Sequence, residues 1–243
     1  MIVKDNRNLC KNIIAFTIGA IFLILLSYSI FNIILWGSDS EKTNKQIATI
    51  GKIVKKSGIN FNKLKGVNPD TKGWIQVSGT NINYPFVQST NNEYYLTHSF
   101  DKRYNQAGWV FMDYRNDIDN LDQNTIIYAH ARIDGTMFGS MKNVLDRDWY
   151  SKADNHIIKI YSEKKKTEWK VFSAYRIKTT DDYLQTSFND DDKFQSFLGL
   201  INNRSIYNFE THTGKNDKVL TLSTCYNETE KVVLHAKLIS NIQ

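Results

Sequence analysis

Residues 218–225 have the sequence KVLTLSTC, which is the strongest fold signal in this chain. Its β-branched and apolar residues predict a buried strand that ends at the thiol of Cys225. A polar turn follows at Tyr226–Glu230, and a second strand is expected from Lys231 to Ile239. A thiol at the end of a strand is a candidate nucleophile, although most free cysteines are simply small buried residues. The position alone leaves both interpretations open.

Short β segments separated by turn-forming clusters fill the chain from Gly73 onward. The expected strands are Trp74–Val77, Asn83–Val87, Gly108–Asp113, Thr125–His130, His156–Tyr161, Glu168–Ile177, Lys218–Thr224 and Lys231–Ile239. Apolar residues at helical spacing predict helices over Thr43–Ser57, Met137–Leu145 and Asp191–Asn202. Roughly eight strands with few helices predict a mostly β fold, a closed or nearly closed barrel.

An apolar segment near the N-terminus, Ile13–Trp36, contains 24 residues and no charged side chain. As a helix it would be about 36 Å long, enough to cross a bilayer. It is too long for a typical cleaved signal core, and no Ala-x-Ala site follows it. We therefore expect an uncleaved transmembrane signal anchor over residues 13–36.

The charges that flank this segment predict its orientation. Basic residues precede it and acidic residues follow it: Lys4, Arg7 and Lys11 before, Asp39 and Glu41 after. The positive-inside rule then places a tail of residues 1–12 in the cytoplasm. Residues 37–66 are expected outside the cell, as a linker that is polar and flexible over 37–45 and then an N-terminal helix.

The overall composition argues against several classes of partner. The net charge of +6 is spread over 243 residues, and no basic block is interleaved with aromatic residues, so no nucleic-acid partner is predicted. The two cysteines, Cys10 and Cys225, lie near opposite ends of the chain, and no zinc-type spacing occurs. We therefore expect no disulfide, no metal and no cofactor.

Among the five histidines, His130 is the best candidate partner for Cys225. An apolar strand, Thr125–Ala129, leads into it and a glycine-containing loop follows, which is the same strand-to-loop arrangement as at Cys225. His98, His156 and His212 lie in or beside loops. Alternation in the last strand predicts that His235 is on the surface. Acyl transfer by a cysteine–histidine pair also needs a group that stabilises the oxyanion. Lys231, across the hairpin from the thiol, could supply it, although most lysines at a strand start are simply solvated.

The run TLSTC at 221–225 resembles the signature strand of sortases, the membrane-anchored cysteine transpeptidases of Gram-positive bacteria. Further segments are similar to class B sortases, in the same order along the chain: NINYPFVQ at 81–88, YYL at 94–96, FMDYRN at 111–116, IIYAH at 126–130, DGTMF at 134–138 and VFSAY at 171–175. The helix expected at Asp191–Asn202 also fits class B. The resemblance implies a closed eight-stranded sortase barrel, with a catalytic domain over residues 67–243.

The resemblance also implies a ping-pong mechanism. Cys225 would cleave a Thr–Gly or Thr–Asn type bond in a C-terminal sorting signal and keep the protein as a thioacyl-enzyme. His130 would protonate the departing amine and later deprotonate the incoming one. That second amine would belong to a peptidoglycan precursor or to another protein, such as a pilin. The family's substrate groove maps onto Asn92, Leu96, Thr179, Tyr183, Leu184 and Ser223, each of which could equally have a plain structural role.

One position departs from the family pattern. Class B sortases carry a catalytic arginine where this chain has Lys231, and lysine is a flexible point charge rather than a planar fork of donors. Three interpretations follow: Lys231 substitutes, another cation such as Arg132 or Arg176 enters the site, or activity is weak. A membrane-tethered binding or assembly protein with little turnover is therefore an alternative, and a hydrolytic cysteine peptidase is another.

Overall fold

The computed structural model describes residues 3–53 and 58–242, in two compact units that meet between Lys42 and Thr43. The first unit is one part of a single helix, α1 (Val3–Gly51). Its segment from Leu9 onward is long and apolar enough to cross a membrane by length and composition. Polar side chains in the apolar part bond back to carbonyl groups one turn earlier, as Thr17 does to Ile13 at 2.8 Å and Asn32 to Tyr28 at 2.9 Å. Those bonds satisfy polar groups where a bilayer offers no water.

The helix continues where a flexible linker was expected. Residues 37–45 are helical throughout, so that prediction was wrong. The helix predicted over Thr43–Ser57 is present through Gly51, and residues 54–57 lie outside the described part. Within the second unit, Gln46 accepts a hydrogen bond from the backbone amide of Phe100 at 3.1 Å, and Ile50 is buried.

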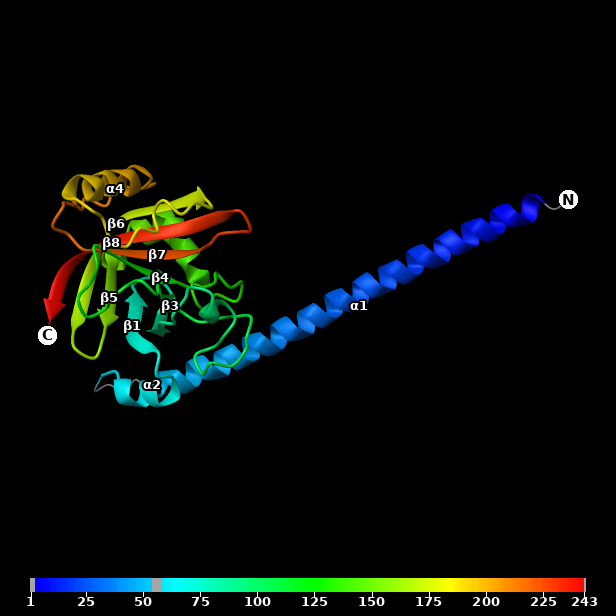
Figure 1. Cartoon of the computed structure of the whole chain (residues 1–243), viewed down its shortest axis with the longest axis horizontal. Helices are drawn as coiled ribbons and strands as arrows, with labels where there is room; N and C mark the ends of the chain where they lie inside the picture. The colour runs from blue at the N-terminus through cyan, green and yellow to red at the C-terminus, as the bar shows by residue number, and fades with distance from the viewer. Residues whose placement is uncertain (1–2, 54–57, 243) are drawn as a thin grey trace. The chain divides into compact units, whose positions relative to one another are not determined.

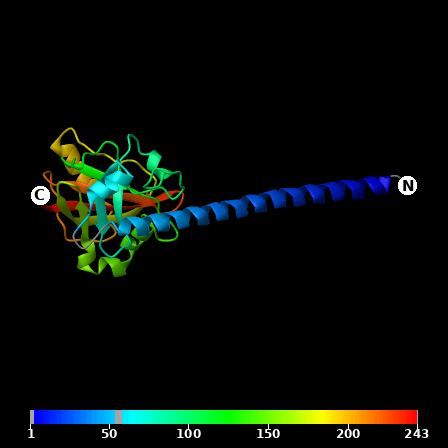
Figure 2. The same cartoon turned by 90° about the horizontal axis from the view of Figure 1, so that it is seen from below.

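Eight strands form a closed barrel, as predicted, in the order β1-β2-β3-β4-β7-β8-β6-β5 (Figure 1, Figure 2). Their bounds are β1 Thr71–Val77, β2 Asn83–Val87, β3 Phe111–Met112, β4 Asn124–Tyr128, β5 Ile157–Tyr161, β6 Lys166–Lys178, β7 Val219–Cys225 and β8 Glu230–Ile242. Only β3 is much shorter than expected. Strand β7 pairs in parallel with β4 and antiparallel with β8, which brings the three strands of the candidate site together.

Short helices precede β1 or lie in the connections between strands. They are α2 Phe61–Val67, η1 Tyr94–Leu96, η2 Gly139–Leu145, α3 Arg147–Tyr150 and η3 Ala153–His156. The helix predicted at Met137–Leu145 is the 3₁₀ helix η2. Helix α2 was not predicted; its N-cap Asn60 accepts the backbone amide of Lys63 at 3.0 Å, which satisfies one of its free donors.

Side chains of β7 and β8 alternate between two buried layers. Leu220, Leu222 and Leu234 face the barrel interior, while Val219 and Val233 face outward against helix α4 (Asp191–Asn203). The apolar face of α4 lies over β6 and β8 (Figure 1) and buries four residues, Phe194, Phe197, Leu198 and Ile201. Burying each one stabilises the fold by about 2 kcal/mol.

This cover overturns the prediction for His235. Alternation correctly places His235 on the outer face of β8, but the side chain is fully buried rather than on the surface. The outer face here is a second core, because α4 and the segment before it cover it. Strand periodicity identifies a face and does not say what packs against that face.

Candidate active site

Cys225 and Lys231 lie at one end of the barrel, on the outer faces of neighbouring strands, and the segment that leads to His130 runs alongside β7. Cys225 is the last residue of β7 and pairs in register with Lys231 of β8. On the other side, Tyr128 of β4 pairs with Ser223 of β7, so two further residues bring His130 level with Cys225. The hydroxyl of Thr224 donates to the carbonyl of Ala129 at 2.7 Å, which holds the two strand ends together beyond the regular pairing.

The ammonium of Lys231 contacts the sulfur directly. Its Nζ lies 3.1 Å from Sγ of Cys225, and Cys225 is exposed at the strand end. A positive charge at this distance stabilises negative charge on the sulfur, and the thiolate is the nucleophilic form of cysteine. The same charge would also lie close to an oxyanion formed on a carbonyl bound to that sulfur.

The imidazole of His130 is oriented by a backbone carbonyl. Its Nε2 lies 2.8 Å from the carbonyl oxygen of Leu96, which can only accept, so Nε2 carries the proton. In the neutral ring, Nδ1 is then left as the basic nitrogen. A histidine with a defined tautomer and partial exposure can both take and release a proton.

The two arginines considered as alternatives to Lys231 are engaged elsewhere. Arg132 has a buried side chain that pairs with Asp134 at 3.2 Å. Arg176 pairs with Glu230 and lowers the pKa of that carboxyl group. Its guanidinium also stacks on the ring of Tyr226, 3.9 Å from the centroid. Of these three cations, Lys231 is the one that the structure shows in contact with the sulfur.

The hairpin that follows Cys225 is held from both sides. The amide of Tyr226 donates to the carbonyl of Glu230 at 2.8 Å, and Asn227 Oδ1 accepts from the amide of Glu230 at 2.8 Å. Lys142 Nζ lies 5.0 Å from the ring centroid of Tyr226, in addition to Arg176. These contacts fix the register that places Lys231 across from Cys225.

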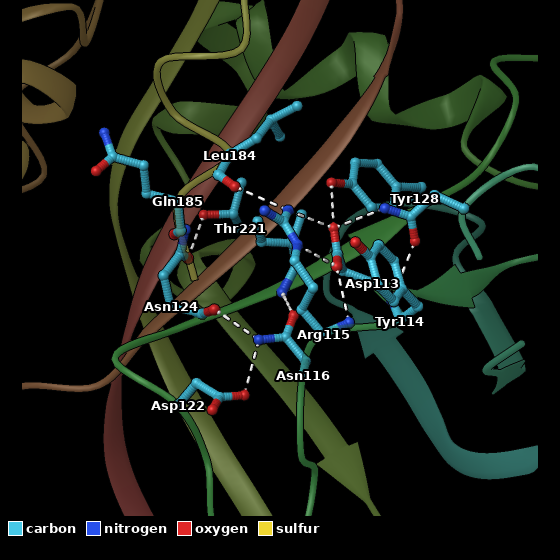
Figure 3. Close-up of polar contacts among 12 residues, drawn as sticks. Asp113, Tyr114, Arg115, Asn116, Asp122, Asn124, Tyr128, Leu184, Gln185 and Thr221 are labelled. Carbon is cyan, nitrogen blue, oxygen red and sulfur yellow. Dashed lines mark hydrogen bonds and ion pairs between the residues drawn. The ribbon is translucent and has the colours of Figure 1, made fainter. Parts of the chain in front are cut away.

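A buried carboxylate, Asp113, organises the neighbouring loops (Figure 3). Arg115 binds it with two side-chain bonds of 2.8 Å each, Asn92 donates to it at 2.8 Å and Tyr128 at 2.9 Å. Burial by itself would raise the pKa of Asp113, but the hydrogen bonds from Arg115, Asn92 and Tyr128 outweigh it and lower that pKa. Arg115 extends the network by donating to the carbonyl of Leu184 at 2.9 Å.

Three residues of the predicted substrate groove are held by hydrogen bonds to this frame or to His130. Both ends of the Asn92 amide are used, by Asp113 and by the backbone amide of Tyr114 at 3.0 Å. Leu184 is held through its carbonyl by Arg115, and Leu96 through its carbonyl by His130. Leu96 leaves 36% of its surface exposed, so its side chain is available for contact beside His130.

Of the other three predicted groove residues, Ser223 lies on β7, while Thr179 and Tyr183 lie in the segment that follows β6. The hydroxyls of Tyr183 and Ser223 are 3.0 Å apart, and both side chains are buried. Thr179 is exposed, and its amide and hydroxyl both donate to the carbonyl of Thr229, at 2.9 and 3.2 Å. Tyr183 and Ser223 thus form a wall just below Cys225, while Thr179 joins the end of β6 to the hairpin.

A buried polar chain runs beneath this wall and was not predicted as part of the site. Thr221 donates to Asn124 at 2.7 Å and therefore accepts from His235 Nδ1 at 2.9 Å. The other ring nitrogen of His235 then accepts from the hydroxyl of Tyr175 at 2.9 Å. Burial, with a smaller contribution from Arg204, lowers the pKa of His235 to about 3 and keeps it neutral. No local sequence signal identifies these partners, because they come from separate strands.

Comparison with known proteins gives the family. A model of the sortase domain matches residues 75–239, more than half of the chain. The chain belongs to the sortase family. It is 39% identical to a sortase B of Staphylococcus aureus over 183 residues, which cover 74% of each chain. Among solved structures, it is similar to a sortase B of B. anthracis, with a TM-score of 0.77 and 33% identity over 84% of this chain and 99% of the other.

A further solved structure is a sortase B–substrate complex from Staphylococcus aureus, with a TM-score of 0.70 and 34% identity over 84% of this chain and 94% of the other. The similarity is thus to sortase B proteins, and this sortase is a cysteine transpeptidase with the barrel of that class. Within residues 9–53 and 58–242, no group of three or more His, Cys, Asp or Glu side chains could hold a metal ion.

Proposed function

We propose that Cys225, His130 and Lys231 are the catalytic residues of this transpeptidase. The observation that carries the proposal is the contact of 3.1 Å between Lys231 Nζ and Cys225 Sγ, at strand ends that also bring His130 level with the thiol. Cys225 attacks the scissile carbonyl and forms a thioester. Splitting amide exchange into two thioester steps needs no external energy source.

His130 moves the proton in both steps. In the first it donates a proton to the departing amine, and in the second it takes one from the incoming amine. The bond from Nε2 to the Leu96 carbonyl keeps the ring oriented between the two steps. Positioned proton transfer of this kind contributes about 10²–10⁴-fold in rate.

Lys231 replaces the arginine of related class B enzymes as the oxyanion-stabilising cation. A single ammonium donates fewer bonds in a less rigid geometry than a guanidinium does. Removing one such donor costs about 10²–10³-fold in kcat. A Lys231→Arg variant separates the alternatives: a lower rate identifies lysine as the working residue, whereas a large gain identifies the native protein as a weakly active, binding-type sortase.

The substrate is proposed to be the C-terminal sorting signal of a surface protein, cleaved at a Thr–Gly or Thr–Asn type bond. Leu96 and Leu184 offer partly exposed apolar surface and Thr179 an exposed hydroxyl, while Asn92, Tyr183 and Ser223 form the bonded frame behind them. A similar sortase B is known as a substrate complex, which supports a substrate site in a barrel of this kind. The acceptor is an amine of a peptidoglycan precursor or of a pilin.

The proposed site faces the outside of the cell, where such acceptors lie. The N-terminal helix anchors the chain, with the tail of residues 1–12 in the cytoplasm and the catalytic domain of residues 67–243 outside. Labelling of Cys225 in intact cells by a membrane-impermeant thiol reagent tests this orientation. Labelling only after the cells are permeabilised would contradict it.

The activity is tested with the full chain in detergent and a library of sorting pentapeptides, with triglycine as amine acceptor. We expect cleavage together with a new amide to triglycine. Cleavage that survives Cys225→Ala would reject the mechanism. Release of only free carboxylate, with triglycine in excess, would instead identify a hydrolytic cysteine peptidase.

A further inference from the structure

The amine of Lys231 is a nitrogen nucleophile in direct contact with the reactive sulfur. Its Nζ lies 3.1 Å from Sγ of Cys225. Among the residues that the structure describes, no carboxylate lies within ion-pair distance of this amine, and its neighbour Glu230 pairs with Arg176 instead. A guanidinium at this position would be permanently protonated, whereas a lysine amine becomes nucleophilic once it loses a proton.

We infer that Lys231 is also an internal acyl acceptor, and that its acylation turns the enzyme off when no external amine is present. The inference rests on the proposed function, because a thioester on Cys225 supplies the acyl group. The product is an amide on Nζ of Lys231, with the free thiol of Cys225 regenerated. Lys231 is thus a self-modification site built into the catalytic pair.

The chemistry is complete without any further reactant. The lone pair of the free Nζ attacks the thioester carbonyl, so a C–N bond forms and the C–S bond breaks. Cys225 leaves as a thiolate, and the proton lost by Nζ passes to that thiolate, directly or through His130. Nothing is oxidised or reduced, and the reaction runs toward the amide because a thioester is the more reactive acyl compound.

The geometry places the amine in the right location for this attack. The acyl carbon would be bonded to Sγ, so a nitrogen 3.1 Å from Sγ is within reach of that carbon. The pairing of Cys225 with Lys231 across β7 and β8 keeps the two groups together, while the four-carbon stem of lysine allows the small adjustment needed. In a well-oriented intramolecular attack of this kind, the effective concentration of the nucleophile reaches about 10⁵ M.

The two roles of Lys231 exclude each other at any instant. As an ammonium it stabilises the oxyanion and cannot attack; as a free amine it attacks and carries no charge. External acceptor favours transfer, because it removes the acyl group before Lys231 reacts with it. Acylated Lys231 has lost its charge, as any acylated lysine has, and can no longer support the oxyanion.

The test uses the full chain in detergent, the fastest-cleaved peptide of the pentapeptide library, and no added amine. Hydroxylamine removes thioesters, so intact-mass measurement after this treatment reports only stable amide adducts. We expect a stable adduct of one acyl fragment, located on the peptide that contains Lys231. Excess triglycine should suppress it, because the external amine removes the acyl group first.

Two arginine variants provide the matched comparison. Lys231→Arg should lower the stable adduct by more than about tenfold, because arginine is not a nucleophile in proteins. Lys178→Arg changes an exposed lysine that lies level with Glu230 on strand β6, and it should leave the adduct unchanged.

The outcomes separate this inference from the proposed function. Peptide cleavage through a hydroxylamine-sensitive thioester, with Lys231 unmodified when no amine is added, would overturn the inference and leave the function standing. Absence of any thioester would overturn the proposed function itself. A Lys231 adduct that persists in Cys225→Ala would also contradict the inference, because it would not come from the thioester.

Discussion

Two residue pairs on β7 and β8 share the same strands and the same outer face, yet have opposite properties. Thr221 pairs in register with His235, and Cys225 pairs with Lys231 four positions along. The first pair lies under α4, fully buried, with both ring nitrogens of His235 bonded. The second pair lies past the edge of that cover, with Cys225 exposed, Lys231 partly exposed and the sulfur contacting one ammonium.

The difference shows that cover, rather than residue type, separates a structural polar pair from a reactive one. Under α4, every proton of the chain Asn124–Thr221–His235–Tyr175 has an acceptor, so the histidine is held neutral and cannot exchange protons with a substrate. At the strand end, solvent and substrate can reach the thiol. Both sites depend on the same strand register, since one register places both pairs.

The largest expected effect comes from removing the exposed nucleophile. Cys225→Ala should lower kcat/KM for peptide cleavage by roughly 10⁴-fold or more, because no thioester can form. The matched change in the buried pair, Thr221→Ala, should lower stability and leave a Cys225-dependent reaction. The comparison fails if both variants lose activity equally while both remain folded in thermal unfolding.

Removing the exposed histidine should have the next largest effect. His130→Gln should lower kcat/KM by about 10³-fold, because the amide cannot transfer a proton. His212→Gln is the control, since His212 is exposed in a loop and should leave the rate unchanged. A full-length chain with normal activity after His130→Gln would remove this residue from the proposed mechanism.

A substitution in the buried hydrogen-bond network around Asp113 should change the free energy of unfolding. Asp113→Ala should lower the free energy of unfolding by about 3 kcal/mol, because the guanidinium of Arg115 loses its buried partner and Asn92 and Tyr128 lose an acceptor. Asp119→Ala is the control: its ion pair with Lys164 is exposed and should contribute less than about 1 kcal/mol. Urea unfolding measures both, and equal losses would show that Asp113 is not a structural centre.

The smallest effect is a pH dependence that belongs to the covered histidine. Burial lowers the pKa of His235 from 6.5 to about 3, so below pH 6.5 the unfolded chain binds a proton that the folded chain refuses. This contribution is present above pH 6.5 and is lost progressively down to about pH 3. Its loss should lower the free energy of unfolding by about 2 kcal/mol when the pH falls from about 7 to about 5.

His235→Gln tests that assignment by its pH slope rather than by its absolute stability. Its unfolding free energy should fall less than that of the native chain over this pH interval, by about 2 kcal/mol. Identical slopes for the two proteins would show that His235 is not the responsible group.

Periodicity and turn chemistry in the sequence were sufficient to predict the barrel, the apolar N-terminal helix and helix α4, because each of those signals is local. The strand KVLTLSTC and the strand leading to His130 both indicated side chains presented at strand ends, and the ordered motifs indicated the family. The hairpin between Cys225 and Lys231 also set which residue faces the thiol, since its length fixes the register. Local patterns had nothing to say about the helical state of residues 37–45, whose polar composition suits a linker equally well.

Contacts between distant segments settled the remaining features. His235 is buried because α4 covers a face that alternation could only label as outward. Asp113 binds Asn92, Tyr128 and Arg115, which come from different loops and strands. Arg132 and Arg176 each pair with a carboxylate. Lys231 is the cation that contacts the sulfur. A side chain's neighbours, and hence its charge state and reactivity, depend on how the barrel closes, and that closure is a property of the whole chain rather than of any one segment.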